Sequence, residues 1–446
     1  MFELFSKPDP CLSSETSVDP MGLQVIWTHY AQAVFKDKVS TLITDARILT
    51  INLFHAYVLN ELHENNVLSN ATDRFREWKT DRDVRLGLLI ALEDFFIYTF
   101  YENRNNGKVD TDGLQGMTKA NQIYRANNKK IIRAEQNAGL LTRQIQLGMM
   151  GRNKGGMVGM GVFNGDLLLN PEVRSSVHEL FNDWPNAIKL KEHLFDFIRK
   201  EVLTASSKQY PTLDYDELKS KPSYRKVRDG YLEVFGKRKL PKAVREFWLD
   251  RIGLHSGAPK AIYDATGKYY AERQLADPSL VMKETHAVLS KEPGEQEKIE
   301  NILRIEPFLS LSDYVFRFIA RKDFKRIADH EEELNLLRKQ LEADVHMNQL
   351  PPKAPHLRLQ KLITIMIGQG RSLHDWIADI INYHKKVMDE RKNSSWLELQ
   401  PRGTIKHVQA AFLPEEINTA KGFLKKRPWF HRYYVDSIQS LRELLK

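Results

Sequence analysis

The sequence predicts a mainly α-helical protein in two lobes, with a glycine-rich loop in the first and a long antiparallel helical hairpin in the second. Apolar residues recur at helical spacing over residues 21–35 and 40–65. Residues 312–350 contain no glycine and no proline, the residues that most often end a helix. The chain of 446 residues is 42% hydrophobic and 28% charged, as in folded proteins with room for two or three domains. We expect an irregular lead-in over 1–20, an N-terminal helical domain over 21–205 and a basic C-terminal helical domain over 206–446.

The first domain should contain a helix that begins near Thr80. Thr80 and Asp83 have the spacing of a capping box, and a very apolar run follows from Val84 to Tyr101. Residues 130–147 fit either short strands or a helix. Helices are predicted to resume at Pro171, because proline is favoured in the first turn of a helix, and again near Asn186. The first domain is therefore expected to be a helical bundle.

A glycine-rich segment, GMMGRNKGGMVGMGVFNG, occupies residues 148–165 and holds seven of the 23 glycines of the chain. Glycine permits close approach of the backbone, so we expect a loop that contacts either another backbone or a phosphate. Arg152 and Lys154 are the candidate phosphate contacts within it. A P-loop is not completed, since Met157 stands where lysine is required after Gly156. The glycine spacing of a dinucleotide-binding turn is not completed either. Tight packing, anion contact and a nucleotide site remain open.

The most basic part of the chain is the block 221–275, where 13 Lys and Arg residues face six Asp and Glu residues. Aromatic residues are interleaved with these cations, and aromatic side chains either stack on bases or pack in the core. We predict that a solvent-facing basic surface of this block binds nucleic acid. The candidate residues of this surface are Arg225, Lys226, Arg228, Lys237, Arg238, Lys239, Lys242 and Arg245. Arg152 and Lys154 of the glycine-rich segment are candidates for the same function.

The C-terminal part of the chain predicts long helices. One helix should run over 312–350, reverse at the LPPKAP loop, and be followed by a second helix over 357–391 that is weakened at Gly368 and Gly370. This antiparallel hairpin would offer apolar seams to a partner protein. Residues 414–445 are expected to be helical with a break at Arg427 and Pro428.

No complete catalytic motif is found, so the prediction leans away from an enzyme and includes no catalytic residue, metal or cofactor. Cys11 is the only cysteine, which excludes an intrachain disulfide and a cysteine-based zinc site. No HExxH motif is present. A metal-dependent nuclease remains an alternative, because Asp214, Asp216, Glu217 and Lys219 have the residue types that hold Mg²⁺ and position water.

Net charge and hydropathy predict a protein that binds polyanions and does not span a membrane. The formal net charge is +9, which favours nucleic acid or an acidic partner. No apolar run approaches 20 residues, and the first 20 residues lack the pattern of a secretory signal. We therefore expect a cytoplasmic protein with no membrane contact.

Two segments carry a resemblance to a group of bacterial proteins. MGLQVIWTHYAQAVFKDKVSTLITDARILTINLF (21–54) and LGMMGRNKGGMVGMGVF (147–163) resemble segments of uncharacterised helical subunits of antiphage and antiplasmid defence systems. The resemblance covers about a ninth of the chain and transfers no catalytic residue. It implies a subunit that works with an ATPase or nuclease encoded elsewhere, for instance as an accessory subunit of an SMC-type complex. A winged-helix pattern, which a kleisin-like subunit would have, is missing at the start of the chain.

Three functions remain open. The first is a non-catalytic subunit of a defence complex that binds DNA through phosphates without reading sequence. The second is the metal-dependent nuclease. The third is a protein–protein adaptor whose positive surface meets an acidic partner and binds no nucleic acid.

Overall fold

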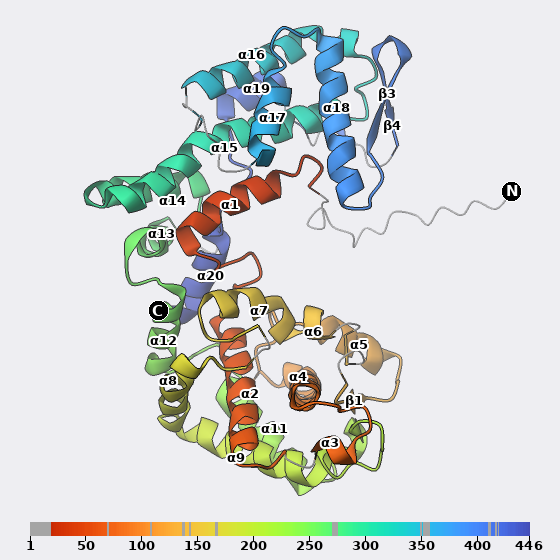
Figure 1. The fold of residues 1–446 in the computed structure, drawn as a ribbon, viewed down its shortest axis with the longest axis vertical. Helices are drawn as coiled ribbons and strands as arrows, with labels where there is room; N and C mark the ends of the chain where they lie inside the picture. The colour runs from red at the N-terminus through yellow and green to blue at the C-terminus, as the bar shows by residue number, and fades with distance from the viewer. Residues whose placement is uncertain are drawn as a thin grey trace, which may run out of the picture. The chain divides into compact units, whose positions relative to one another are not determined.

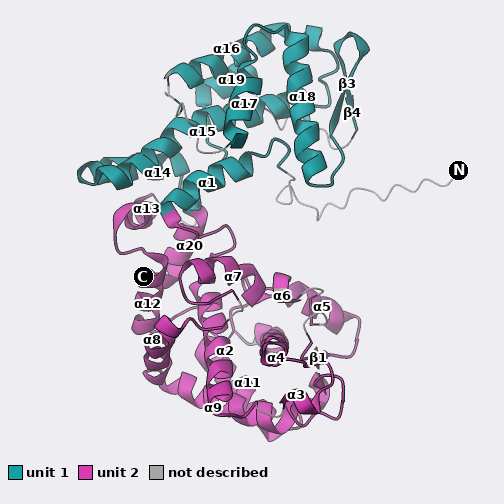
Figure 2. Ribbon diagram, viewed as in Figure 1, with its two compact units in different colours: residues 1–34, 276–435 teal, residues 35–275, 436–446 magenta. Residues whose placement is uncertain are grey.

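The computed structural model describes residues 19–68, 71–107, 109–135, 139–141, 144–165, 168–269, 275–347, 350, 357–408, 412–414, 417 and 419–446. The described chain is mainly helical, as predicted, and its strands pair as two small antiparallel sheets (Figure 1). It divides into two compact units, each built from two stretches of chain (Figure 2). Unit 1 contains residues 1–34 and 276–435, and unit 2 contains residues 35–275 and 436–446. The expected lead-in lies outside the described residues up to residue 18, as do Cys11 and most of the LPPKAP loop.

This division differs from the boundary expected near residue 205. Strand β1 (Ile131–Arg133) pairs antiparallel with strand β2 (Thr212–Asp214), with Ile132 opposite Leu213. Helix α9 (Pro185–Phe197) packs along helix α11 (Pro222–Phe235). Chain on both sides of residue 205 therefore shares one core, and the change in charge near that point does not mark a change of domain.

Unit 2 is organised around helix α4 (Asp81–Asn103), which Figure 1 shows end-on with other helices around it. The predicted capping box is confirmed, because the Thr80 side chain accepts from the Asp83 amide and the Asp83 carboxylate accepts from the Thr80 amide. Every residue from Leu86 to Tyr101 is buried, which explains the apolar run in the sequence. The other helices of the unit are α2 (Ala46–Glu64), α3 (Ala71–Arg74), α5 (Met117–Arg125), α6 (Gln144–Leu147), α7 (Met149–Gly159), α8 (Pro171–Asn182), α10 (Tyr215–Leu218), α12 (Lys242–Ile252), α13 (Gly257–Lys268) and α20 (Val435–Leu445), with short turns η2 (Arg104–Asn106) and η3 (Ile198–Val202).

The prediction of a glycine-rich loop was wrong, because most of that segment is helix α7. Its glycines permit close packing instead. A Cβ atom at Gly159 would overlap the backbone carbonyl of Asp37, and a Cβ at Gly156 would overlap the side chain of Ile43. The contact with a neighbouring backbone, one of the possibilities left open by the sequence, is therefore the one that the structure contains.

Unit 1 is a helical bundle flanked by a β-hairpin. Helix α15 (Pro293–Ile319) packs against α14 (Pro278–Val288) and α16 (Glu331–Met347), and α16 packs in turn against α17 (Leu357–Ile367). The remaining elements are α1 (Leu23–Phe35), α18 (Leu373–Glu390), α19 (Ala420–Lys426), strands β3 (Leu397–Gln400) and β4 (Thr404–His407), and the short turns η4 (Leu289–Lys291), η5 (Ile327–His330) and η6 (Pro401–Gly403).

The predicted helix lengths in the hairpin over 312–391 were wrong, because both helices are broken, although α16 and α17 on either side of the LPPKAP loop do pack against each other. The first ends at Ile319, where a turn between Arg321 and Phe324 replaces the helical hydrogen bonds. The Arg321 guanidinium binds the Asp323 carboxylate through two contacts of 3.0 Å, and the backbone of Lys322 donates to Phe412. Tertiary bonds of this kind end a helix without glycine or proline. The second helix is interrupted at Gly368 and Gly370, both at positive φ, where the sequence indicated weakness.

The predicted break at Arg427 and Pro428 is confirmed, and a buried carboxylate holds the extended chain that follows. Glu306 of α15 accepts from the amides of Phe430 and His431 at 3.0 and 3.1 Å and from the Tyr433 hydroxyl at 2.7 Å. Its carboxylate also lies 2.9 Å from His431 Nδ1. Burial opposes ionisation of Glu306, but the His431 charge and these bonds outweigh burial, so the pKa of Glu306 is lowered. The Glu306 carboxylate of α15 therefore binds three residues of the segment 427–434, namely Phe430, His431 and Tyr433.

No helix of the described chain combines the length and the apolar character needed to cross a membrane.

Candidate nucleic-acid interface

The ten candidate cations all belong to unit 2, but they do not form a single surface. Arg152 and Lys154 lie on α7, three others lie on α11, and the rest follow in the loop 236–241 and on α12. Figure 1 shows α7 and α11 at well-separated levels of the unit. The glycine segment and the basic block are therefore separate features.

Helix α11 has one aromatic face inside the unit and one basic face outside. Tyr224, Tyr231 and Phe235 are at most 2% exposed, so their rings belong to the core and cannot stack on bases. Arg225 and Lys226 are exposed and, within the described chain, their side chains form no hydrogen bond or ion pair. Their charges are free to meet phosphates.

Three further free cations follow on the short connection to α12. Lys237, Lys239 and Lys242 are exposed, and none has a hydrogen bond or ion pair with another described residue. Leu240, between them, is 3% exposed, so its side chain attaches this part of the chain to unit 2, and Pro241 occupies the N-cap position of α12. Free cations on both sides of a buried leucine suit contact with the phosphates of a nucleic acid.

Arg238 has a structural role rather than a free charge. Its guanidinium lies 3.5 Å from the buried Asp45 carboxylate and 3.2 Å from Asp110, and it donates to the Asp112 carbonyl at 3.1 Å. The fully buried Arg47 shares these partners, since it donates to the carbonyls of Asp110 and Asp112. Arg238 therefore closes a network that ties residues 110–112 to α2.

Arg228 and Arg245 are likewise only partly available. Arg228 pairs with the neighbouring Asp229 at 2.7 Å and lies over the Tyr224 ring. Arg245 is half-buried, and its Nε atom is inaccessible and forms no hydrogen bond with the described residues. Sequence alone could not separate these arginines from the free lysines.

The start of α7 is closed to a phosphate by an acid that the sequence analysis did not select. Glu93 of α4 is buried, and its carboxylate accepts from the Met150 amide at 2.7 Å and from Gln144 at 2.8 Å. Burial raises the pKa of Glu93 to about 7, against the effect of these bonds. A carboxyl group of the protein already occupies this helix N-terminus. Arg152 is exposed and Lys154 is half-buried, so only their side chains remain as phosphate contacts.

Glu93 and its neighbour Asp94 could have been found from sequence. They are the two acids inside the apolar run from Val84 to Tyr101, and charged residues in such a run are either paired or functional. Asp94 accepts from the Leu140 amide at 3.0 Å, and burial raises its pKa well above the ordinary value. The pair fixes the segment around 140–150 onto α4.

The residues of the nuclease alternative are engaged in local structure. Asp214 caps α10 by accepting from the amides of Asp216 and Glu217. Asp216 pairs with Lys130 at 2.7 Å and with Lys219 at 2.8 Å, and Lys219 also binds Glu102. Among the described residues, no group of three or more His, Cys, Asp or Glu side chains is placed to hold a metal ion. Two lysines therefore neutralise Asp216, and Asp214 is engaged as a helix cap.

Positive charge is concentrated in the unit that carries the free cations. Unit 2 holds 40 of the 67 Lys and Arg residues and 32 of the 58 Asp and Glu residues. Its formal net charge is therefore +8, against +1 for unit 1. Long-range attraction of a polyanion would act on unit 2.

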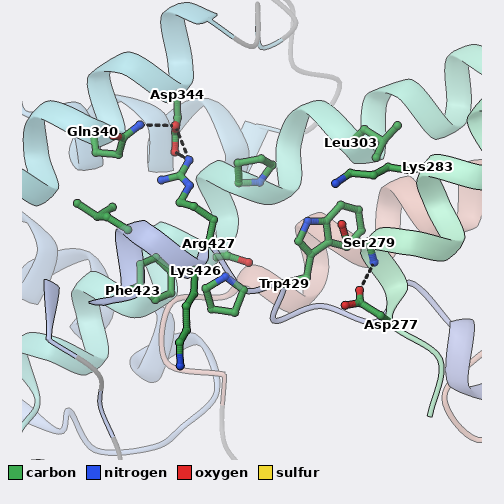
Figure 3. A pocket seen from close by; sticks show the side chains of 14 residues that line it. Asp277, Ser279, Lys283, Leu303, Gln340, Asp344, Phe423, Lys426, Arg427 and Trp429 are labelled. Atoms are coloured by element: carbon green, nitrogen blue, oxygen red, sulfur yellow. Dashed lines mark hydrogen bonds and ion pairs between the residues drawn. The ribbon is translucent and has the colours of Figure 1, made fainter. Parts of the chain in front are cut away.

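Unit 1 contains a pocket of about 680 Å³ between α14, α15, α16 and the chain at 423–429 (Figure 3). On one side Arg427 turns toward Asp344, with contacts of 2.5 and 2.6 Å, and on the other lie Lys283 and the ring of Trp429. Lys426 points away from the pocket in this view. Pro307 interrupts α15 at the pocket wall and deprives the Leu303 carbonyl of its usual helical donor.

The described lining of this pocket holds no histidine and no cysteine, and its most buried acid, Asp344, is already paired with Arg427. It offers an aromatic surface, one free lysine and one carbonyl to a small amphiphilic group.

Comparison of the chain with protein-family models, with curated proteins and with solved structures gives no match.

Proposed function

We propose that the protein is a non-catalytic DNA-binding and scaffolding subunit that holds the phosphate backbone on unit 2. The observation that carries the proposal is the set of five exposed cations without partners in the described structure: Arg225, Lys226, Lys237, Lys239 and Lys242. Tyr224, Tyr231 and Phe235 of α11 are buried and are not available to bases. Binding would therefore depend on phosphates and be indifferent to base sequence.

The resemblance stated from the sequence places this binding in a cytoplasmic bacterial defence complex with an ATPase or nuclease as partner. That assignment rests on the resemblance, whereas the DNA contact rests on the charges of unit 2. The two parts are tested separately. DNA binding of the purified protein tests the DNA contact, and stoichiometric co-purification with a partner from its own host tests the assignment to a complex.

The decisive experiment is binding of the purified protein to labelled duplex DNA across a salt series. A variant with Lys237→Gln, Lys239→Gln and Lys242→Gln should bind more weakly. Its slope of log K against log salt should be smaller by about 2–3, since each phosphate contact contributes about 0.9 to that slope.

A matched control carries Lys322→Gln, Lys325→Gln and Lys339→Gln in unit 1. These lysines are also exposed, and the change in net charge is identical. Equal slopes for the two triple variants would show that overall charge, rather than the surface of unit 2, binds DNA, and would contradict the proposal.

The same samples, incubated with Mg²⁺ and analysed on a denaturing gel, test the nuclease alternative. Intact DNA is expected. Cleavage that is lost in Glu217→Ala would replace the scaffold proposal with an enzyme, and absence of both binding and cleavage at low salt would leave the protein–protein adaptor.

A further inference from the structure

A groove in unit 1 runs between α17 and α18, which lie side by side in Figure 1. Its volume is about 690 Å³, which is as large as that of the pocket beside Trp429. Ile365, Tyr383 and Val387 contribute apolar surface, and Leu357 at its edge is 71% exposed. The groove therefore offers apolar contacts bordered by charged side chains, the arrangement found at surfaces that bind polypeptide.

The rims of the groove carry an excess of positive charge. Arg358 binds Glu390, and Arg371 binds Asp379, so these four charges are paired. Lys361 and Lys386 are exposed and have no ion pair or hydrogen bond with the described residues. The groove therefore presents two free lysines to whatever covers it, and acidic chain would complement them.

A polar group inside the groove wall also lacks a partner. Tyr383 is 7% exposed, and within the described structure its inaccessible hydroxyl forms no hydrogen bond. Burial raises the pKa of Tyr383 to about 12, so this hydroxyl is a neutral donor. A buried hydroxyl without a partner is costly, and a carbonyl or carboxylate of covering chain would accept its proton.

The N-terminal stretch of the chain reaches the described structure at one end of this groove. Asp19 lies 3.1 Å from Arg391, directly after α18, and the Pro20 carbonyl lies 2.8 Å from His384 Nδ1. Gly22 is at positive φ, and a Cβ there would overlap the guanidinium of Arg358. Residues 19–22 thus contact three side chains on or beside α17 and α18, those of Arg358, His384 and Arg391, and residues 1–18 precede them in the chain.

Residues 1–18 have the composition that the groove requires. Phe2, Leu4 and Phe5 form an apolar cluster around Glu3, and the charged side chains of 1–18 sum to −2. The groove-lining part of α18, from Asp379 to Glu390, is roughly 16 Å long. An extended chain covers about 3.3 Å per residue, so this segment is long enough to reach the whole groove.

We propose that residues 1–18 bind in the α17–α18 groove of the same molecule, with the apolar cluster on its floor and acidic side chains beside Lys361 and Lys386. A partner that competes for the groove would have to present apolar and acidic residues in the same way. This inference is independent of DNA binding by unit 2.

Cys11, the only cysteine of the chain, gives a direct test in the full-length protein. Asn382→Cys places a second thiol at an exposed position of the groove lining. Mild oxidation at low protein concentration should give an intramolecular disulfide, identified by mass spectrometry. Its yield should be roughly tenfold that of the matched variant Lys291→Cys, because docking raises the effective concentration of the two thiols. Lys291 is exposed at η4, and the connection between α14 and α15 lies across unit 1 from α18 in Figure 1.

Charge reversal distinguishes docking from chance encounter. Added to the Asn382→Cys variant, Lys361→Glu with Lys386→Glu should lower the yield of the disulfide to Cys11 by roughly fivefold through the loss of charge complementarity. Lys322→Glu with Lys325→Glu should leave that yield unchanged. Equal yields for the Asn382→Cys and Lys291→Cys variants would overturn the proposal. A disulfide that joins two molecules would also overturn it, and would assign the groove to a second copy of the chain.

Discussion

Glu93 is a carboxylate that the fold holds at a helix N-terminus away from water. Burial raises its pKa to about 7, although the amides of Met150 and Met149 and the side chain of Gln144 favour the charged form. The folded protein therefore binds a proton more readily than the unfolded chain does between about pH 4.5 and pH 7. The contribution of Glu93 to stability is greatest below this window and falls as pH rises through it.

Glu93→Gln should remove this pH dependence. Between pH 5 and pH 8 the natural protein should lose about 3 kcal/mol of unfolding free energy through Glu93, from a pKa difference of about 2.5 at 1.36 kcal/mol each. The variant should lose correspondingly less. Urea unfolding at several pH values, with hydrogen exchange of α4 and α7 to follow unit 2, measures the difference. Glu233→Gln, an exposed position on α11, is the control, and an unchanged pH slope in Glu93→Gln would refute the assignment.

Two glycines of helix α7 differ in what surrounds them. Gly159 faces the backbone of Asp37 so closely that a methyl group would not fit, whereas a Cβ at Gly155 would meet no atom within 4 Å. Gly155→Ala should stabilise unit 2 by about 0.5–1 kcal/mol, because alanine favours the helix. Gly159→Ala should destabilise it by about 1–3 kcal/mol, because the backbone of the 36–38 turn must move. Thermal or urea unfolding of the two variants gives the signs, and a matching sign for both would contradict this packing.

The connection between α11 and α12 contains a second test. Arg238→Gln should destabilise unit 2 by about 1–2 kcal/mol, because the buried Asp45 and its neighbour Asp110 lose a cationic partner that is itself about one-third exposed. Lys239→Gln should change stability by less than about 0.5 kcal/mol. Urea unfolding distinguishes the two. If both variants were equally stable, Arg238 would have to be counted again among the free cations.

Across the whole molecule, local signals in the sequence were reliable and long-range signals were not. The capping box at Thr80, the first-turn proline at Pro171 and the break at Arg427 all depend on neighbouring residues, and all are found in the structure. The glycine helix and the end of α15 at Ile319 depend on Asp37 and Phe412, which lie far away in sequence. Periodicity and composition contain no information about such contacts.

In the candidate nucleic-acid interface, too, local features could be predicted from the sequence and long-range contacts could not. Exposure of Lys237, Lys239 and Lys242 could be anticipated from a basic block, as could burial of aromatic residues at helical spacing. The engagement of Arg238 with Asp45 and Asp110 could not, because Arg238 lies 193 and 128 residues away from them along the chain. The groove beside Lys361 was expected only as a general apolar seam of a hairpin, and its connection with residues 19–22 required the fold.

The discontinuous make-up of unit 2 has a consequence for biosynthesis. Residues 436–446 supply α20, whose Ile438 and Leu441 are fully buried and whose Ser437 donates to the Ser40 carbonyl. Residues 35–275 leave the ribosome before residues 436–446 are made, so nascent unit 2 is expected to expose an apolar face while residues 276–435 of unit 1 are translated. We therefore expect chaperones to bind unit 2 during that interval, and a chain that stops at residue 435 to accumulate less than the full chain, because α20 completes a core that residues 35–275 begin.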